Sequence, residues 1–468
     1  MTTPVEEVLQ HYKLPFTLRK DQNEDINTLC DPDWVRNGIY LPVGAGKTAT
    51  ATMVAFHAGL KDLIDQIIVL CPPILLRQWV SWLESFNSVE TLLYRGTPAQ
   101  RKEMSFDKAD CIVTTPGLFK NDFARFMEFF SQRRIYLIVD EATCVRQVGT
   151  LMYKAARDFT NTGQKMLSLL TGTTISAPFQ AYGYVKLIAP SIYRDYSHFT
   201  MVHITRLDQY KTPCAYQNLD LLAKNMAFHT VRREARDIMD LPDVNYVPVL
   251  YDLDPAHMRL YNRVVEELLV TLDDGAILDG LTPQRMRMTA QRVILMPAEF
   301  GGEKIKPIGF QLIDDFVTEL GGEKLIIYSN FRSSNETVFD YCAAAGLNPA
   351  LVYGGNSSKQ SFEELKRFKS DPACLALVGN PRSVGIGVDG LQDICHAVLF
   401  LELPTPDEFE QAVGRVDRQG QKIRSVVKIG TANHTVQVSM MRNSLKKEDL
   451  VKKVVPTKTS MRKALMGG

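Results

Sequence analysis

A glycine-rich segment that ends in Lys47 and Thr48 is the clearest chemical signal in this sequence. The run 43–48 reads VGAGKT and lies between an apolar stretch and a helix-prone stretch. Glycines let backbone N–H groups converge on phosphate oxygens, and the N-terminus of a following helix adds partial positive charge. In this arrangement Lys47 would bridge the β- and γ-phosphates, and the Thr48 hydroxyl would ligate Mg²⁺. The predicted backbone cradle consists of Gly44, Ala45 and Gly46. The loop is a variant, because Leu41 stands where the strict pattern has glycine.

A pair of acidic residues at the end of an apolar run is the second signal. The run 136–139 (YLIV) is followed directly by Asp140 and Glu141. A strand that ends in this way places both carboxylates at the edge of a sheet, where ligands gather in open α/β sheets. We expect Asp140 to hold Mg²⁺ through its water shell and Glu141 to orient and deprotonate an attacking water. Together with Lys47, the pair predicts hydrolysis of a nucleoside triphosphate.

Two arginines three residues apart, Arg415 and Arg418, lie in the segment 411–421 (QAVGRVDRQGQ). If the segment is a helix, this spacing places both guanidinium groups on one face. Two such cations would stabilise charge on a γ-phosphoryl group as arginine fingers. Gln411 belongs to the same predicted catalytic set. A further turn of small hydroxyl residues, 171–173 (TGT), is expected to pass the state of the γ-phosphate to a bound nucleic acid.

These groups require strands that deliver them to one edge of a sheet. In both halves of the chain, apolar runs of strand length alternate with helix-prone segments, which predicts parallel sheets flanked by helices. The predicted strands are 67–70, 111–114, 137–139 and 166–170, then 247–253, 324–329, 351–353, 375–379, 397–401 and 426–429. We therefore predict an α/β fold with two lobes, 1–230 and 231–468, and a helical protrusion at about 256–296.

Composition is typical of a soluble globular protein, with 45% hydrophobic and 23% charged residues among 468. That length predicts two or three domains. The eight cysteines form no CxxC pair, which argues against a zinc site or a disulfide framework and favours a reducing compartment. We expect an intracellular protein of the cytoplasm, with the nucleus left open, and no membrane partner.

The distribution of charge is more informative than the net charge of +1. A basic tail at about 442–468 contains eight Lys or Arg residues against two acidic residues. Such a tail suits phosphate contact. A solvated, frayed terminus explains the same residues equally well, so the tail leaves both interpretations open.

In their order along the chain, these blocks resemble helicase superfamily two, and in detail its Swi/Snf-type branch. The resemblance extends from about residue 14 to residue 453, and the motifs are specific as an ordered set. Besides the phosphate loop and the Asp-Glu pair, the matching segments are LRKDQ at 18–22, CPPILLRQW at 71–79, VTTP at 113–116, LTGT at 170–173, RR at 232–233, IIYSNF at 326–331, SVGIGV at 383–388 and QAVGRVDRQGQ at 411–421.

This resemblance implies two RecA-like lobes that hydrolyse ATP with Mg²⁺ in the cleft between them and move along duplex DNA without separating its strands. It also implies that Gln22 reads the adenine. The implied partner is double-stranded or branched DNA; we expect a monomer, and the sequence names no protein partner. The residues implied to contact the DNA backbone are Arg77, Thr114 and Thr115 in the first lobe, and Ser329, Asn330 and Gly387 in the second.

Two departures from the family pattern bear on how tightly the nucleotide is coupled to DNA. Thr143 stands where the family usually has His, and Thr174 replaces the usual Pro after the TGT turn. The inserts between motifs are short, which favours a bare motor of the kind that viruses and bacteria encode.

Two other functions remain open from the sequence. One is a strand-separating or branch-migrating helicase of the same superfamily. The other is an inactive DNA-binding scaffold, against which the full set of predicted catalytic residues argues. An RNA helicase is disfavoured by the forms of the 71–79 and 411–421 motifs, and a nuclease-coupled motor by the absence of a recognisable nuclease site.

Overall fold

The computed structural model describes residues 2–454 apart from 15, 43, 173, 209–210, 239, 274–282 and 385–389. The chain divides into two compact units, which we call the first and second lobes. The first lobe comprises Met1–Met239 and Asp449–Lys458, and the second comprises Asp240–Glu448 and Thr459–Gly468. The first division follows residue 239, later than the predicted 230, because the strand Thr230–Arg232 pairs with the first lobe's sheet.

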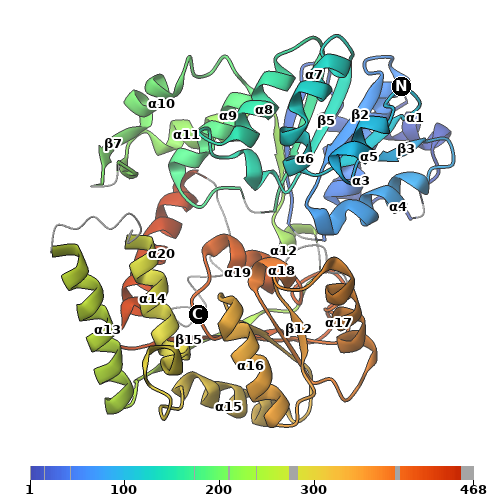
Figure 1. Ribbon diagram of the computed structural model, residues 1–468. Helices are drawn as coiled ribbons and strands as arrows, with labels where there is room; N and C mark the ends of the chain where they lie inside the picture. The colour runs from blue at the N-terminus through green and yellow to red at the C-terminus, as the bar shows by residue number, and fades with distance from the viewer. Residues whose placement is uncertain are drawn as a thin grey trace. The chain divides into compact units, whose positions relative to one another are not determined.

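The first lobe is built on a parallel sheet in the order β3-β4-β2-β5-β6-β1-β9 (Figure 1). Its central strands are apolar and buried along their whole length, as expected for a parallel sheet covered on both faces. All four strands predicted for this half are present. The strands are β1 (Arg36–Tyr40), β2 (Gln66–Leu70), β3 (Thr91–Leu93), β4 (Cys111–Thr114), β5 (Ile135–Asp140), β6 (Lys165–Leu170) and β9 (Thr230–Arg232).

Helices follow most of these strands and pack an aromatic-rich core against the sheet, with Phe119, Phe126 and Phe130 fully buried. The antiparallel hairpin β7 (Ile204–Leu207) and β8 (Pro213–Tyr216) follows α10 and was not predicted. The helices are α1 (Pro4–His11), α2 (Lys20–Leu29), α3 (Lys47–Leu60), α4 (Leu76–Glu84), α5 (Pro98–Glu103), α6 (Pro116–Asn121), α7 (Phe123–Phe130), α8 (Leu151–Thr160), α9 (Ala181–Ile188), α10 (Tyr196–His203), α11 (Leu219–Ala227) and α12 (Ala235–Ile238).

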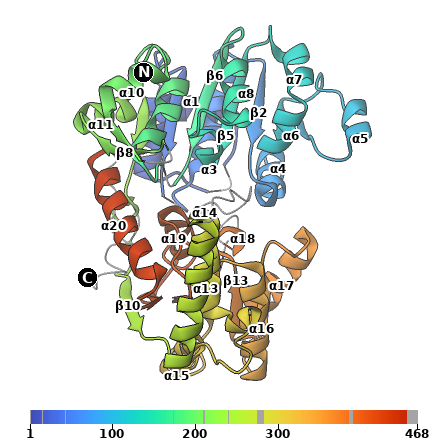
Figure 2. The same ribbon diagram turned by 60° about the vertical axis from the view of Figure 1, so that its left-hand side comes forward.

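The second lobe repeats this architecture with a parallel sheet in the order β10-β15-β14-β11-β13-β12 (Figure 2). Its strands are β10 (Asn245–Tyr251), β11 (Leu325–Tyr328), β12 (Ala350–Val352), β13 (Ala376–Gly379), β14 (Ala397–Phe400) and β15 (Val426–Ala432). Its helices are α13 (Pro255–Asp273), α14 (Pro283–Leu295), α15 (Gln311–Leu320), α16 (Arg332–Ala344), α17 (Ser358–Ser370), α18 (Pro381–Val384), α19 (Pro406–Val413) and the first part of α20 (Val436–Val454). Two parallel sheets flanked by helices confirm the predicted α/β fold with two RecA-like lobes.

Helices α13 and α14 occupy the segment for which a helical protrusion was predicted, and they pack against each other. The basic tail differs from a frayed terminus along its described part. It begins inside α20, and from Asp449 onward that helix belongs to the first lobe, where Val451 and Val454 join the core cluster. The rest of the tail, 455–468, lies outside the described residues.

Candidate active site

The glycine-rich loop connects β1 to α3 at the carboxyl edge of the first lobe's sheet. Gly44 and Gly46 both have left-handed backbones, with φ of 80° and 84°. A Cβ added at Gly46 would meet the amide end of the Gln22 side chain, which would have to shift, and the left-handed backbone itself favours glycine. Lys47 and Thr48 open α3, as predicted, whereas Val43 lies outside the described residues.

Gln22, the predicted adenine reader, lies beside this loop. It is buried in α2, and its Oε1 accepts a hydrogen bond from the Arg19 amide at 3.0 Å. The Arg19 guanidinium in turn donates to the Ala45 carbonyl at 2.9 Å and pairs with Asp21. Arg19 and Ala45 are 26 residues apart in the sequence, and their hydrogen bond joins the 18–22 motif to the loop as one structural unit.

The Lys47 ammonium group folds back over the loop. Its Nζ donates to the carbonyl oxygens of Leu41 at 3.0 Å and Pro42 at 3.1 Å. These neutral acceptors hold the cation at the mouth of the glycine cradle. A polyphosphate is the natural competitor for such a cation, because hydrogen bonds to charged oxygens are stronger than those to carbonyls.

Asp140 ends β5, two strands from β1 in the same sheet, and is almost fully buried. One carboxylate oxygen accepts from the Trp79 indole at 2.8 Å, and the other accepts from the Glu141 amide at 2.9 Å. Burial raises the pKa of Asp140, and the hydrogen bond from Trp79 and the charge of Lys47 oppose that rise. A cation at this carboxylate would favour its ionised form.

Glu141 has a left-handed backbone, with φ of 50°, which is uncommon for a residue other than glycine. Strained conformations of this kind are retained where the surrounding structure fixes them, often at functional sites. Here β5 and the short helical turn Ala142–Val145 fix it. The half-buried carboxylate of Glu141 thus follows Asp140 at the sheet edge that carries the phosphate loop.

The donor set fits ATP with Mg²⁺. A threonine hydroxyl and a carboxylate oxygen are hard ligands that Mg²⁺ accepts, and this ion usually completes its shell with water and phosphate oxygens. No cluster of three or more His, Cys, Asp or Glu suited to a metal occurs among the described residues.

Two further residues that shape the site had no role assigned from the sequence. Trp79, on α4, positions Asp140 by donating to its carboxylate. The only sequence feature that could have indicated this contact is that a buried indole N–H usually needs an acceptor. Arg233, just after β9, pairs with buried Asp25 at 2.8 Å and thereby ties the edge of the sheet to α2. Asp25 lies one helical turn after Gln22, so this ion pair also anchors the helix that carries Gln22.

The TGT turn follows β6, where the Thr171 amide donates to the Ile39 carbonyl at 3.2 Å. Thr171 is completely buried, and this hydrogen bond joins the turn to β1. Thr173 lies outside the described residues. Thr174, which replaces the expected proline, is also buried.

The predicted DNA contacts of the first lobe differ in exposure. Arg77 is exposed on α4, and Thr115 is half-buried and caps α6 by accepting the Leu118 amide at 3.2 Å. Thr114 is completely buried, and its hydroxyl donates to the Tyr94 carbonyl at 2.9 Å. The Thr114 hydroxyl is therefore committed to the protein interior.

In the second lobe, Ser329 and Asn330 follow β11. The Ser329 hydroxyl is completely buried and bonds to Ser334 and to Glu402, while the Asn330 side chain donates to the Leu403 carbonyl. Glu402 also accepts from the Asn330 amide. The Asn330 turn is thus anchored by a buried carboxylate, and Gly387 lies outside the described residues.

The predicted arginine pair does not lie on a helix. Helix α19 ends at Val413, and Arg415 and Arg418 lie in the turns that follow Gly414. Glycine is a poor helix former, and this one ends the helix that the spacing argument assumed. Arg415 is buried, Arg418 is half-buried, and Gln411 is half-buried within α19 itself.

A sequence profile described as an SNF2-related domain matches residues 22–295, more than half of the chain and all of the phosphate-loop site from Gln22 onward. The chain belongs to the SNF2-related family. That family lies within the ATP-dependent helicase and translocase superfamily, and its members are ATPases. The TGT, Asp-Glu and glycine-rich segments of this SNF2-related chain all lie inside the match.

Individual relatives are distant. The chain is 23% identical over 412 residues to a zebrafish (Danio rerio) chromodomain-helicase-DNA-binding protein 1-like, covering 81% of this chain and 38% of that protein. It is 22% identical over 440 residues to an uncharacterised ATP-dependent helicase of Bacillus subtilis, covering 88% of this chain and 75% of that protein. A solved helicase domain of Hef from Pyrococcus furiosus aligns with a TM-score of 0.53 at 16% identity, over 92% of this chain and 100% of that one. The last likeness supports the fold alone.

None of the described helices is long and apolar enough to cross a membrane.

Proposed function

We propose that this SNF2-related ATPase is a translocase that moves along double-stranded DNA and remodels protein–DNA complexes or branched DNA. The observation that carries the proposal is the assembly, at one sheet edge, of a glycine cradle with Lys47, a buried Asp140 held by Trp79, and Glu141. The ordered Swi/Snf-type motifs support duplex DNA as the track. The chain spans 38% of the zebrafish relative's length.

In the proposed mechanism, Gln22 binds the adenine and Lys47 binds the β- and γ-phosphates. The Thr48 hydroxyl and, through the water shell of the ion, Asp140 would hold Mg²⁺, which would neutralise charge on the phosphates. The oxygen of the attacking water bonds to the γ-phosphorus while Glu141 accepts a proton from that water. The bond between the γ-phosphorus and the β–γ bridging oxygen breaks at the same time. Arg415 and Arg418 remain the predicted arginine fingers, and Gln411 remains in the predicted catalytic set.

The test is the steady-state ATPase rate, measured without nucleic acid and then with duplex DNA, branched DNA, single-stranded DNA or RNA. We expect duplex DNA to stimulate turnover strongly, with a further rise on branched DNA if junctions are the target. Stimulation mainly by single strands or RNA would support a helicase instead. No turnover under any condition would support a scaffold.

A further inference from the structure

The turn that follows β3, 95–97, lies beside the turn that carries Thr115. Strands β3 and β4 are parallel, with Leu93 opposite Val113, so the turns at their carboxyl ends leave the same edge of the sheet. The Tyr94 amide donates to the Val113 carbonyl at 2.9 Å, and the Thr114 hydroxyl returns a bond to the Tyr94 carbonyl. These two hydrogen bonds fix the positions of the two turns relative to each other.

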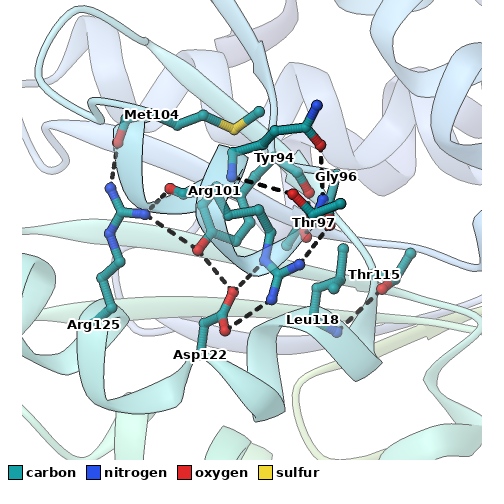
Figure 3. A network of polar contacts seen from close by, with 11 residues as sticks. Tyr94, Gly96, Thr97, Arg101, Met104, Thr115, Leu118, Asp122 and Arg125 are labelled. Atoms are coloured by element: carbon teal, nitrogen blue, oxygen red, sulfur yellow. Dashed lines mark hydrogen bonds and ion pairs between the residues drawn. The ribbon is translucent and has the colours of Figure 1, made fainter.

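An ion pair between buried Arg101 and half-buried Asp122 fixes the 95–97 turn (Figure 3). Arg101 donates through Nε and Nη2 to both oxygens of Asp122, at 2.5 and 3.1 Å, and through Nη1 to the Gly96 carbonyl at 2.5 Å. The Tyr94 hydroxyl donates to the same carboxylate at 2.8 Å. Arg101 holds the pKa of Asp122 below its usual range, so the pair stays charged. Because Asp122 lies between α6 and α7, one carboxylate joins the β3 turn to the helices that follow Thr115.

The outer side of this turn suits a polyanion. Arg95 and Gly96 are exposed, and among the described residues no carboxylate pairs with Arg95 and no acceptor takes the amide of either residue. Arg77, on the helix that follows neighbouring β2, is likewise exposed with no carboxylate partner in the described part of the chain. The acidic residues Glu90 and Asp110, which immediately precede β3 and β4, lie at the opposite edge of the sheet.

We propose that the 95–97 turn is a further DNA-backbone contact of the first lobe, with Arg95 as the contacting cation and the Arg101–Asp122 pair as the positioning unit that holds the turn beside Thr115. The inference rests on the proposed function and extends it to a segment that the sequence motifs did not include. The ligand is the sugar–phosphate backbone of duplex DNA, recognised through charge and amide N–H groups rather than through base identity.

The first test compares Arg95→Ala with Lys108→Ala. Both residues are exposed and each change removes one positive charge, but Lys108 lies before β4, at the opposite edge of the sheet. We expect Arg95→Ala to raise the duplex DNA concentration for half-maximal ATPase stimulation several-fold and to lower the slope of log affinity against log salt by about one. Basal ATPase should be unchanged, and Lys108→Ala should match wild type. Equal behaviour of the two variants would overturn the inference.

The second test addresses the positioning role of Arg101. Arg101→Lys keeps the charge but loses the geometry that joins Asp122 to Gly96, so DNA binding should weaken while basal ATPase persists. If Arg101 acts through the turn, adding Arg95→Ala to Arg101→Lys should weaken binding less than the two separate effects predict. Full additivity would contradict the positioning role. A wild-type protein that fails to bind duplex DNA would refute the proposed function itself, which separates the two failures.

Discussion

At the scale of single residues, the two neighbouring carboxylates of the site, Asp140 and Glu141, have different roles in the proposed mechanism. Both oxygens of Asp140 accept hydrogen bonds from Trp79 and the Glu141 amide, whereas Glu141 is the predicted base. Glu141→Gln should therefore bind ATP and DNA yet lower turnover by roughly 10²- to 10⁴-fold, the usual contribution of a general base. Nucleotide binding and ATPase rate, measured on the same preparation, check this. Near-normal turnover would refute the assignment of the base.

Glu402 gives a pH-dependent prediction of its own. Burial raises its pKa to about 7, although Ser329 and the Asn330 amide donate to it; Tyr251 and Arg292 are the other titratable or charged groups acting on it. Its folded-state pKa lies above the unfolded value, so the folded protein binds the extra proton between those two values. The free energy of unfolding should thus fall as pH rises from about 4.5 to about 7, by up to about 3 kcal/mol.

The measurement for Glu402 is denaturant unfolding of wild type and Glu402→Gln across this pH range. Glutamine keeps one acceptor oxygen for Ser329 and Asn330 but does not ionise. The stability of wild type relative to the variant should decline with rising pH and level off above about 7. A pH-independent difference would show that Glu402 does not titrate in this window.

At the scale of elements, the sequence predicted what hydrophobic patterning controls and missed what local backbone geometry controls. Buried parallel strands read as apolar runs, so β2, β4, β5 and β6 were found within two residues of their ends. Strand β3 has only half-buried residues, and β9 has three residues, too few for a pattern. The helix predicted through Arg415 ends instead at Val413, because Gly414, a poor helix former, follows it.

The residues of the candidate site also differ in whether a local sequence pattern could reveal them. The sequence predicted that Lys47, Asp140 and Glu141 lie at one edge of the sheet, because each follows a strand or loop that carries its own pattern. The Trp79 and Arg233 contacts depend on side chains that approach from elements far away in the sequence, which no local pattern records. The buried hydroxyls of Thr114 and Ser329 show the same limit, since motif position does not reveal which way a side chain points.

The β1–α3 turn supplies a prediction at this scale. Gly46→Ala would place a Cβ against Gln22 in a left-handed conformation that costs about 1–2 kcal/mol, so ATP affinity should fall about tenfold or more. Gly59→Ala is the matched control, because Gly59 lies in the same helix with open space around its Cβ position. That control should bind ATP normally and unfold at a slightly higher temperature. ATP titration of both variants decides whether the glycine requirement is local to the loop.

At the scale of the whole molecule, the described residues after the 411–421 motif form a sheet strand and a helix that pack into the lobes. β15 pairs between β10 and β14 in the second sheet, and α20 packs Met440, Met441 and Leu445 against the second lobe's core before Val451 and Val454 enter that of the first. These segments are therefore committed to the fold. The proposed translocase and the strand-separating helicase alternative differ in whether the two strands of the DNA stay paired as the protein moves.

The distinction is measurable with two substrates of equal length. A translocase should displace the third strand of a DNA triplex when supplied with ATP, because it only has to move along the duplex beneath that strand. The same protein should leave a plain forked duplex paired, since movement along both strands together does not pull them apart. Glu141→Gln serves as the control on both substrates and should be inactive on each. Efficient unwinding of the fork would establish the helicase alternative, whereas DNA-stimulated ATPase without triplex displacement would show that hydrolysis is not coupled to movement.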